Sequence, residues 1–130
     1  MNKIIGKDKL EKIFGQWPSF HDAEIQQIIL KRYPENDMRW PTLQIIIHLL
    51  EITKGLNKNN FVTFIFTKIN ELVLENFNHQ NVIFALKINE LTDSENNDQK
   101  FNVIFESAYG CDLSFQCNTI EIESVKSYHE

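Results

Sequence analysis

The sequence is poor in the residues that build phosphate-binding loops and membrane spans. It has four glycines, and none stands in a G-x-G-x-x-G or Walker arrangement, so no phosphate cradle is predicted. No apolar run approaches the roughly 20 residues that a membrane-spanning helix needs. Lys7, Asp8 and Lys9 interrupt the apolar segment that a signal peptide requires. We therefore expect a cytoplasmic protein that does not bind a membrane.

The two cysteines, Cys111 and Cys117, are too few for a disulfide framework and too far apart for one bridge. On a single strand, a rise of about 3.3 Å per residue separates their Cα atoms by about 20 Å, whereas a disulfide needs about 5.5 Å. A single C-x5-C spacing is not a zinc signature either. The sequence therefore predicts two free thiols, which suit a reducing compartment.

Positive charge is also scarce, since 13 Lys and Arg residues stand against 18 Asp and Glu, for a formal net charge of −5. Nucleic acids and anionic membranes both need clustered basic residues, so neither is expected as a partner. An acidic surface permits a basic protein partner, because opposite charges accelerate association. Acidic proteins are nevertheless common without such a partner, and we give this ordinary explanation more weight.

Phenylalanine is abundant, with ten residues in a chain of 130, and it indicates a β-rich core with aromatic cross-strand pairs. This length predicts one domain, residues 1–130, that buries roughly two thirds of its unfolded surface. Residues 8–14 have the apolar spacing of a short helix, with Asp8 and Glu11 as a capping box and Gly15 as its stop. The remainder of the chain has strand patterns.

Strands are predicted where apolar residues alternate or β-branched residues gather, over 23–33, 42–52, 61–69, 82–91, 101–105 and 113–117. The strand at 61–69 resumes at 72–74 after a break or bulge, and the strand at 113–117 continues at 120–122. In residues 82–91 we expect Val82, Phe84, Leu86 and Ile88 to share one face. A loop is predicted at 54–60, and a bulge or bend near Asn118-Thr119, where the alternation changes phase.

These elements predict an α+β fold that is mostly β, with an N-terminal helix packed on a curved antiparallel sheet of about six strands. The strands at 42–52 and 61–69 carry apolar residues on both faces. Both faces of the sheet must then be covered, by the helix, by the curvature of the sheet, or by a second copy in a homodimer.

One dense motif, Trp17-Pro18-Ser19-Phe20-His21-Asp22-Ala23-Glu24, separates the helix from the first strand. His21, Asp22 and Glu24 are residue types that bind a divalent cation or transfer protons. Their spacing matches no metal motif and no second ligand cluster stands out, so we expect no metal and no cofactor. We prefer a structural role, in which Asp22 accepts backbone hydrogen bonds and His21 packs beside the buried Trp17 or Phe20.

This motif resembles the N-terminal motif of the immunity protein 50 family of bacterial polymorphic toxin systems. The resemblance continues in Phe77-Asn78-His79-Gln80-Asn81-Val82-Ile83, which is similar to the family's F-N-x-Q-N-V-I stretch, and then in Tyr109-Gly110 and Phe115-Gln116-Cys117. It implies a non-catalytic immunity protein that binds and neutralises a cognate toxin domain in the producer's cytoplasm. The motif residues, with a structural or a binding role, are Trp17, Phe20, His21, Asp22, Glu24, Asn78, Gln80, Asn81 and Gly110.

An immunity protein needs an exposed surface that suits its partner, and acidic segments would meet a basic toxin. The candidates are Glu35, Asp37, Asp93, Glu95 and Asp98, joined by Glu121 and Glu123 if their strand face is exposed. The amide-rich loop at Asn78, Gln80 and Asn81 is the next candidate. Two other functions remain open: a small metal-dependent enzyme using His21, Asp22 and Glu24, and a dimeric ligand-binding β module.

Overall fold

The computed structural model describes residues 4–33, 39–53, 56–92 and 98–128. Within them, one helix precedes eight strands: α1 (Lys7–Phe14), β1 (Glu24–Lys31), β2 (Thr42–Thr53), β3 (Leu56–Thr67), β4 (Asn70–Glu75), β5 (Val82–Glu90), β6 (Phe101–Tyr109), β7 (Asp112–Cys117) and β8 (Thr119–Ser127). The strands form an antiparallel sheet in the order β4-β7-β6-β5-β1-β2-β3-β8. The expected helix on an antiparallel sheet is confirmed, with eight strands instead of about six.

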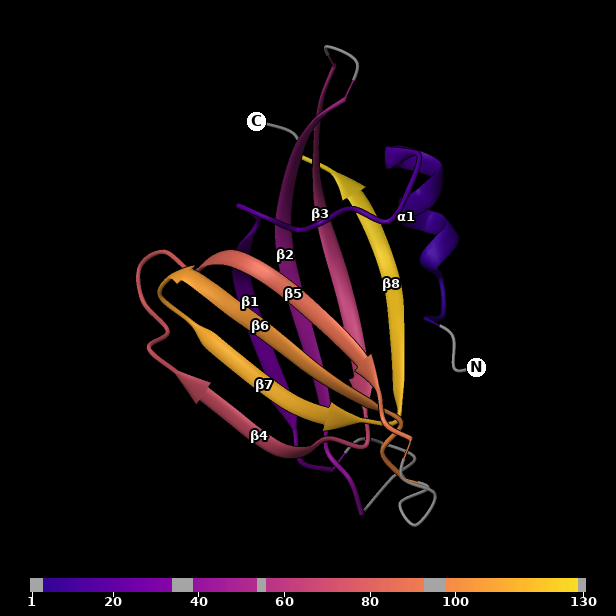
Figure 1. The fold of residues 1–130 in the computed structure, drawn as a ribbon, viewed down its shortest axis with the longest axis vertical. Helices are drawn as coiled ribbons and strands as arrows, with labels where there is room; N and C mark the ends of the chain where they lie inside the picture. The colour runs from indigo at the N-terminus through magenta and orange to yellow at the C-terminus, as the bar shows by residue number, and fades with distance from the viewer. Residues whose placement is uncertain (1–3, 34–38, 54–55, 93–97, 129–130) are drawn as a thin grey trace.

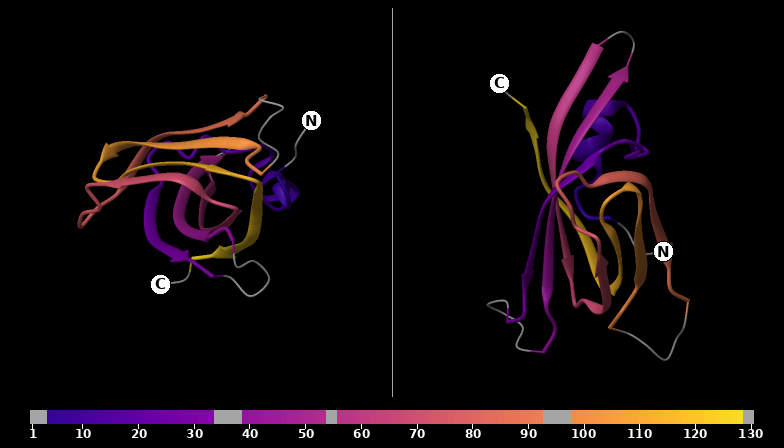
Figure 2. Two further views of the ribbon diagram at one scale, coloured as in Figure 1. Left: turned by 90° about the horizontal axis from the view of Figure 1, so that it is seen from below. Right: turned by 90° about the vertical axis from the view of Figure 1, so that its left-hand side faces the viewer.

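The sheet folds back on itself into two layers that share one core (Figure 1). The first layer contains β1, β2, β3 and β8, and the second contains β5, β6, β7 and β4. The ring of Phe66 on β3 lies 4.8 Å from that of Phe115 on β7 and 6.4 Å from that of Phe105 on β6, centroid to centroid. Figure 2 shows that α1 lies on the same side of the first layer as the strands of the second.

Two corners join the layers. At the first, β1 and β5 pair only through Glu24 and Val82, whereas β2 and β3 pair along their whole length. At the second, the chain turns between β7 and β8 at Asn118, whose N–H donates to the carbonyl oxygen of Thr67 at 2.8 Å. The buried positions change there from odd to even numbers, which confirms the predicted bend. Curvature of the sheet therefore encloses most of the core.

Three local predictions were wrong. No side-chain cap begins α1, because Gly6 in a left-handed conformation (φ 78°) precedes it in place of the expected capping box. The predicted loop at 54–60 is mostly strand, because β3 begins at Leu56, opposite Thr53. In β5, two register shifts flank Ile83, which is buried, whereas Phe84 is exposed. Contrary to the prediction, Phe84 therefore does not share the core face of Leu86 and Ile88.

The expected stop of α1 is confirmed, since Gly15 (φ 81°) donates its N–H to the carbonyl oxygen of Glu11 at 2.8 Å. Leu10 and Phe14 are buried in the shared core. Over the described residues, no helix has sufficient length and apolar character to cross a lipid bilayer.

Candidate functional site

Three segments that sequence analysis singled out meet at the first corner of the sheet, and we call this region the motif corner: residues 17–25, 78–83 and 109–111. The N–H of Ile25 donates to the carbonyl oxygen of Asn81, and the N–H of Ile83 donates to that of Ala23, both at 2.8 Å. The N–H of Asp22 donates to the carbonyl oxygen of Ile83 at 2.9 Å. Backbone hydrogen bonds thus join the first motif to the start of β5.

Asn81 ties the second segment to the third with its buried side chain. Its Oδ1 accepts hydrogen bonds from the N–H of Asn78 at 2.8 Å and from the N–H of Cys111 at 3.1 Å. Its Nδ2 donates to the carbonyl oxygen of Asn78 at 3.0 Å. Asn81 is only 4% exposed, and Cys111 beside it is buried. A buried amide that satisfies three backbone groups has a structural role at this position.

Gly110 permits the β6–β7 turn to lie directly against this amide. Its φ of +86° belongs to the left-handed region that glycine adopts without strain. A Cβ atom at this position would lie 2.2 Å from the carbonyl oxygen of Gln80 and 2.7 Å from Oδ1 of Asn81. Any side chain at residue 110 would therefore separate the turn from the 78–81 loop.

The first motif makes a strained turn that is anchored by an aromatic cluster. Phe20 and Asp22 both have positive φ, 63° and 68°, which is uncommon for residues with a side chain. Phe20 is fully buried, and its ring lies 5.6 Å from Trp17 and 5.5 Å from Phe64, in edge contacts. Trp17 is partly buried. Packing of Phe20 therefore holds the turn against its backbone strain.

His21 and Asp22 face outward from this turn, with side chains 53% and 75% exposed. The carboxylate of Asp22 lies 3.3 Å from Nδ1 of His21, and the ring of His21 contacts Phe84 at 5.6 Å rather than Trp17 or Phe20. Glu24 accepts a hydrogen bond from Gln26 at 2.7 Å. In the described part of the chain, no three His, Cys, Asp or Glu side chains are grouped closely enough to hold a metal ion.

The 78–81 loop adds a second exposed pair of rings to the motif corner. The ring of His79 lies 5.6 Å from that of Tyr109, and the backbone N–H of His79 donates to Oδ1 of Asn78 at 2.9 Å. Tyr109, Phe77 and Phe84 are all exposed. Sequence reasoning did not identify these three aromatics as exposed, and it placed Phe84 on an apolar strand face, because phenylalanine in a strand pattern normally predicts burial. Exposed aromatic side chains are favoured anchors in protein interfaces.

The acidic candidates that the structure describes lie away from the motif corner. Asp98 forms an ion pair with Lys68, its carboxylate 3.6 Å from Nζ. Glu35, Asp37, Asp93 and Glu95 lie outside the described residues. Glu123 is exposed and Glu121 is partly buried.

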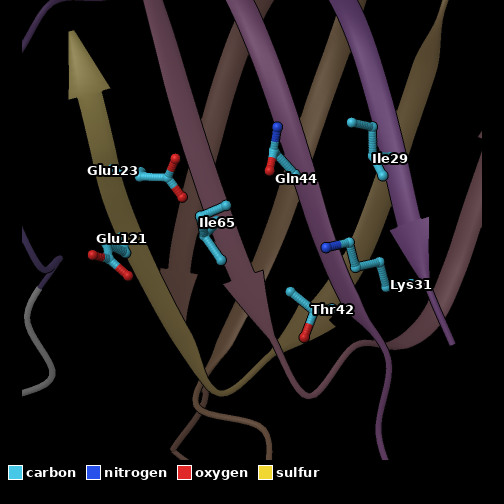
Figure 3. Close-up of a pocket in the computed structure, with 7 residues that line it drawn as sticks. All are labelled: Ile29, Lys31, Thr42, Gln44, Ile65, Glu121 and Glu123. Atoms are coloured by element: carbon cyan, nitrogen blue, oxygen red, sulfur yellow. The ribbon is translucent and has the colours of Figure 1, made fainter. Parts of the chain in front are cut away.

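These two carboxylates on β8 face a shallow hollow of about 210 Å³ on the outer side of the first layer. Gln44 and Ile65 form its floor, and Lys31 on β1 lies at the opposite side (Figure 3). The hollow therefore contains both charge signs, and its geometry does not select a ligand.

The two cysteines are free, as the spacing predicted, and both are buried. Burial, followed by the charge of Asp112, raises the pKa of the Cys111 thiol to about 11. Burial raises the pKa of the Cys117 thiol to about 12. Both groups are neutral thiols at pH 7, and a neutral thiol is a poor nucleophile.

Comparison with known families identifies one relationship that extends over nearly the whole chain. The family model described as Immunity protein 50 matches residues 6–128, which include α1, all eight strands and the three segments of the motif corner. No significant match is found among curated proteins or among solved structures. The chain therefore belongs to the immunity protein 50 family.

Proposed function

We propose that this protein is the immunity partner of a bacterial toxin domain, which it binds one to one and neutralises in the cytoplasm of the cell that makes the toxin. The observation that carries the proposal is the family match over residues 6–128. Neutralisation by binding requires no catalytic group. It requires a stable surface that is complementary to the toxin.

The motif corner supports such a role because it combines a rigid framework with exposed side chains. The framework consists of buried Phe20, buried Asn81 and partly buried Gly110. His21 and Phe84 are exposed above it and contact each other. Side chains held in place before binding lose less conformational freedom in the complex, which favours tight association. We therefore assign the framework to stability and keep the exposed residues as candidate toxin contacts.

The acidic segments remain proposed contacts as well. The whole chain has a net charge of −5, which would steer a basic toxin domain toward this protein. The residues that contribute to this charge include Glu35, Asp37, Asp93, Glu95 and Asp98. Charges of this kind mainly change the association rate and its dependence on salt.

Gene context and protection of cells test the proposal. We expect the adjacent gene to encode a large secreted protein with a C-terminal toxin domain. Expression of that domain alone should stop growth, and co-expression of this chain should restore it. Co-expression with a catalytically inactive toxin domain should yield a stable complex. Toxicity that persists despite soluble, folded immunity protein would contradict the proposed function.

A further inference from the structure

The two outer edges of the sheet differ in how their backbone groups are protected. Along β8, the N–H of Ile5 donates to the carbonyl oxygen of Ile120 at 2.8 Å, and the N–H of Ile122 donates to that of Ile5 at 2.7 Å. Nζ of Lys9 donates to the carbonyl oxygen of Glu123 at 3.0 Å. The N-terminal segment therefore covers this edge, as natural proteins commonly do to prevent unwanted strand pairing.

The opposite edge, formed by β4, is open. Over the described residues β4 pairs with β7 on one side only, and Figure 1 shows it at the outer margin of its layer. Glu71 has a φ of 55° and lies in a register shift between Asn70 and Val73, so regular pairing begins at Val73. Val73 and Leu74 are 49% and 45% exposed. An open edge with exposed apolar residues is a template for another strand.

Charge at this edge selects the kind of strand that can bind. Glu75 lies directly opposite Asp112 of β7, and like charges at such positions repel each other. Oδ1 of Asp112 accepts a hydrogen bond from the N–H of Ser107 at 3.0 Å. Of the Lys, Arg and His residues that the structure describes, none forms an ion pair with either carboxylate. A cation from a partner would relieve the repulsion.

A hollow beside these carboxylates has a lining that suits a long basic side chain. It measures about 210 Å³, and its lining includes Val73, Ile104, Glu75 and Asp112. Lys and Arg combine an apolar stem with a charged end, so the stem can contact Val73 and Ile104 while the charge reaches the carboxylates. The hollow therefore matches one Lys or Arg of an extended segment bound along β4.

We propose that β4 is the docking edge for the toxin, which adds an extended segment beside Val73–Glu75 and places a Lys or Arg between Glu75 and Asp112. This inference rests on the proposed function, since it names the surface that the toxin uses. A second copy of the chain is a poor occupant of the edge. Its β4 carries Glu71 and Glu75 and no Lys or Arg, so it would bring further negative charge to the edge.

Charge variants of the edge test this inference with the inactive toxin domain encoded by the adjacent gene as the probe. Glu75→Gln with Asp112→Asn removes both charges, and Glu75→Lys reverses one of them. Glu11→Gln is the matched control, because Glu11 is exposed on α1, the helix that packs against β8. Association rate, dissociation constant and thermal midpoint are measured for each variant at low and high salt.

We expect the neutral double variant to bind about tenfold more weakly at low salt, mainly through slower association, and Glu75→Lys to bind more weakly still. The thermal midpoint of the double variant should stay the same or rise, because a repulsive pair is removed. A purely structural role for the pair would lower the midpoint as well. The control should bind like the wild type. Wild-type binding by a folded Glu75→Lys variant would overturn the proposal.

Hydrogen exchange of the wild-type complex provides a second readout. Toxin binding should slow exchange of the amides in β4 and leave those of β8 unchanged. Protection at the motif corner without protection of β4 would overturn the docking edge and leave the proposed function intact. Protection of β4 that rises with protein concentration before toxin is added would mean that a second copy occupies the edge. Failure of the wild type to bind the toxin would overturn the proposed function together with the edge.

Discussion

Substitution of Asn81 tests most clearly which contacts stabilise the motif corner. Asn81→Ala removes three hydrogen bonds to backbone groups. The N–H of buried Cys111 loses its partner, and an unpaired buried donor costs about 1–3 kcal/mol. The two groups on exposed Asn78 can bond to water instead, so each adds about 0.5 kcal/mol. The expected loss is about 3 kcal/mol in the free energy of unfolding, or about 10 °C in the thermal midpoint.

Urea denaturation of Asn81→Ala and Asn78→Ala side by side measures this loss. The control removes the same atoms three residues away, where the side chain is exposed and accepts hydrogen bonds from His79. It should cost less than about 1 kcal/mol. The midpoint of Asn81→Ala should fall without a change in the denaturant slope, which reports the surface exposed on unfolding. Equal free energies of unfolding for the two variants would refute the framework role of Asn81.

Further predictions concern the rest of the motif corner and the two thiols. Gly110→Ala should cost at least about 2 kcal/mol in the free energy of unfolding, because its Cβ collides with backbone at a positive φ; a thermal midpoint equal to that of the wild type would contradict this. Phe20→Ala should cost about 3–5 kcal/mol and Trp17→Ala less, since only Phe20 is fully buried; the reverse order by urea denaturation would mean that Trp17 is the anchor. Burial raises the pKa of the thiols of Cys111 and Cys117 from 9.0 to about 11 and about 12. The folded chain therefore keeps protons that the unfolded chain loses, so stability should decline as pH rises above 9, and Cys117→Ala should reduce the decline. Rapid alkylation of the native protein by iodoacetamide at pH 8 would show that the thiols are accessible and ionised.

Much of the fold was readable from the sequence because burial follows simple alternation in several strands. Leu43, Ile45 and Ile47 occupy one face of β2, and all three are buried in the core. The phase change after Cys117 likewise marked the corner at Asn118. Period-two patterns identify the face that is buried, since successive residues point to opposite sides.

Pairing between distant strands could not be predicted in the same way. Leu72–Leu74 follows β3 in the chain, yet β4 pairs with β7 at the far edge of the sheet. The local sequence pattern of β4 does not identify β7 as its partner, because this pairing depends on how the two layers close over their shared core. The prediction for Phe84 was wrong for a related reason, because register shifts in β5 changed the expected direction of its side chain.

The sequence motif located the candidate site, but the roles of its individual residues depend on contacts between segments that are distant in sequence. The sequence of the 78–81 loop does not distinguish Asn81 from Asn78. Asn81 is buried against the β6–β7 turn, whereas Asn78, three residues earlier, is exposed. His21 and Asp22 are adjacent in sequence and remain paired at the surface. The contact of His21 with Phe84 on β5 required the fold.

Titration of toxin activity with the purified immunity protein tests the central claim most directly. A fixed amount of active toxin domain is mixed with increasing amounts of this protein, and the remaining activity is measured. Binding as proposed predicts that activity falls linearly and reaches its floor at one immunity protein per toxin domain. Complete inactivation by a small fraction of that amount would reveal catalysis, and undiminished activity at an excess of folded protein would show that the toxin is not its partner.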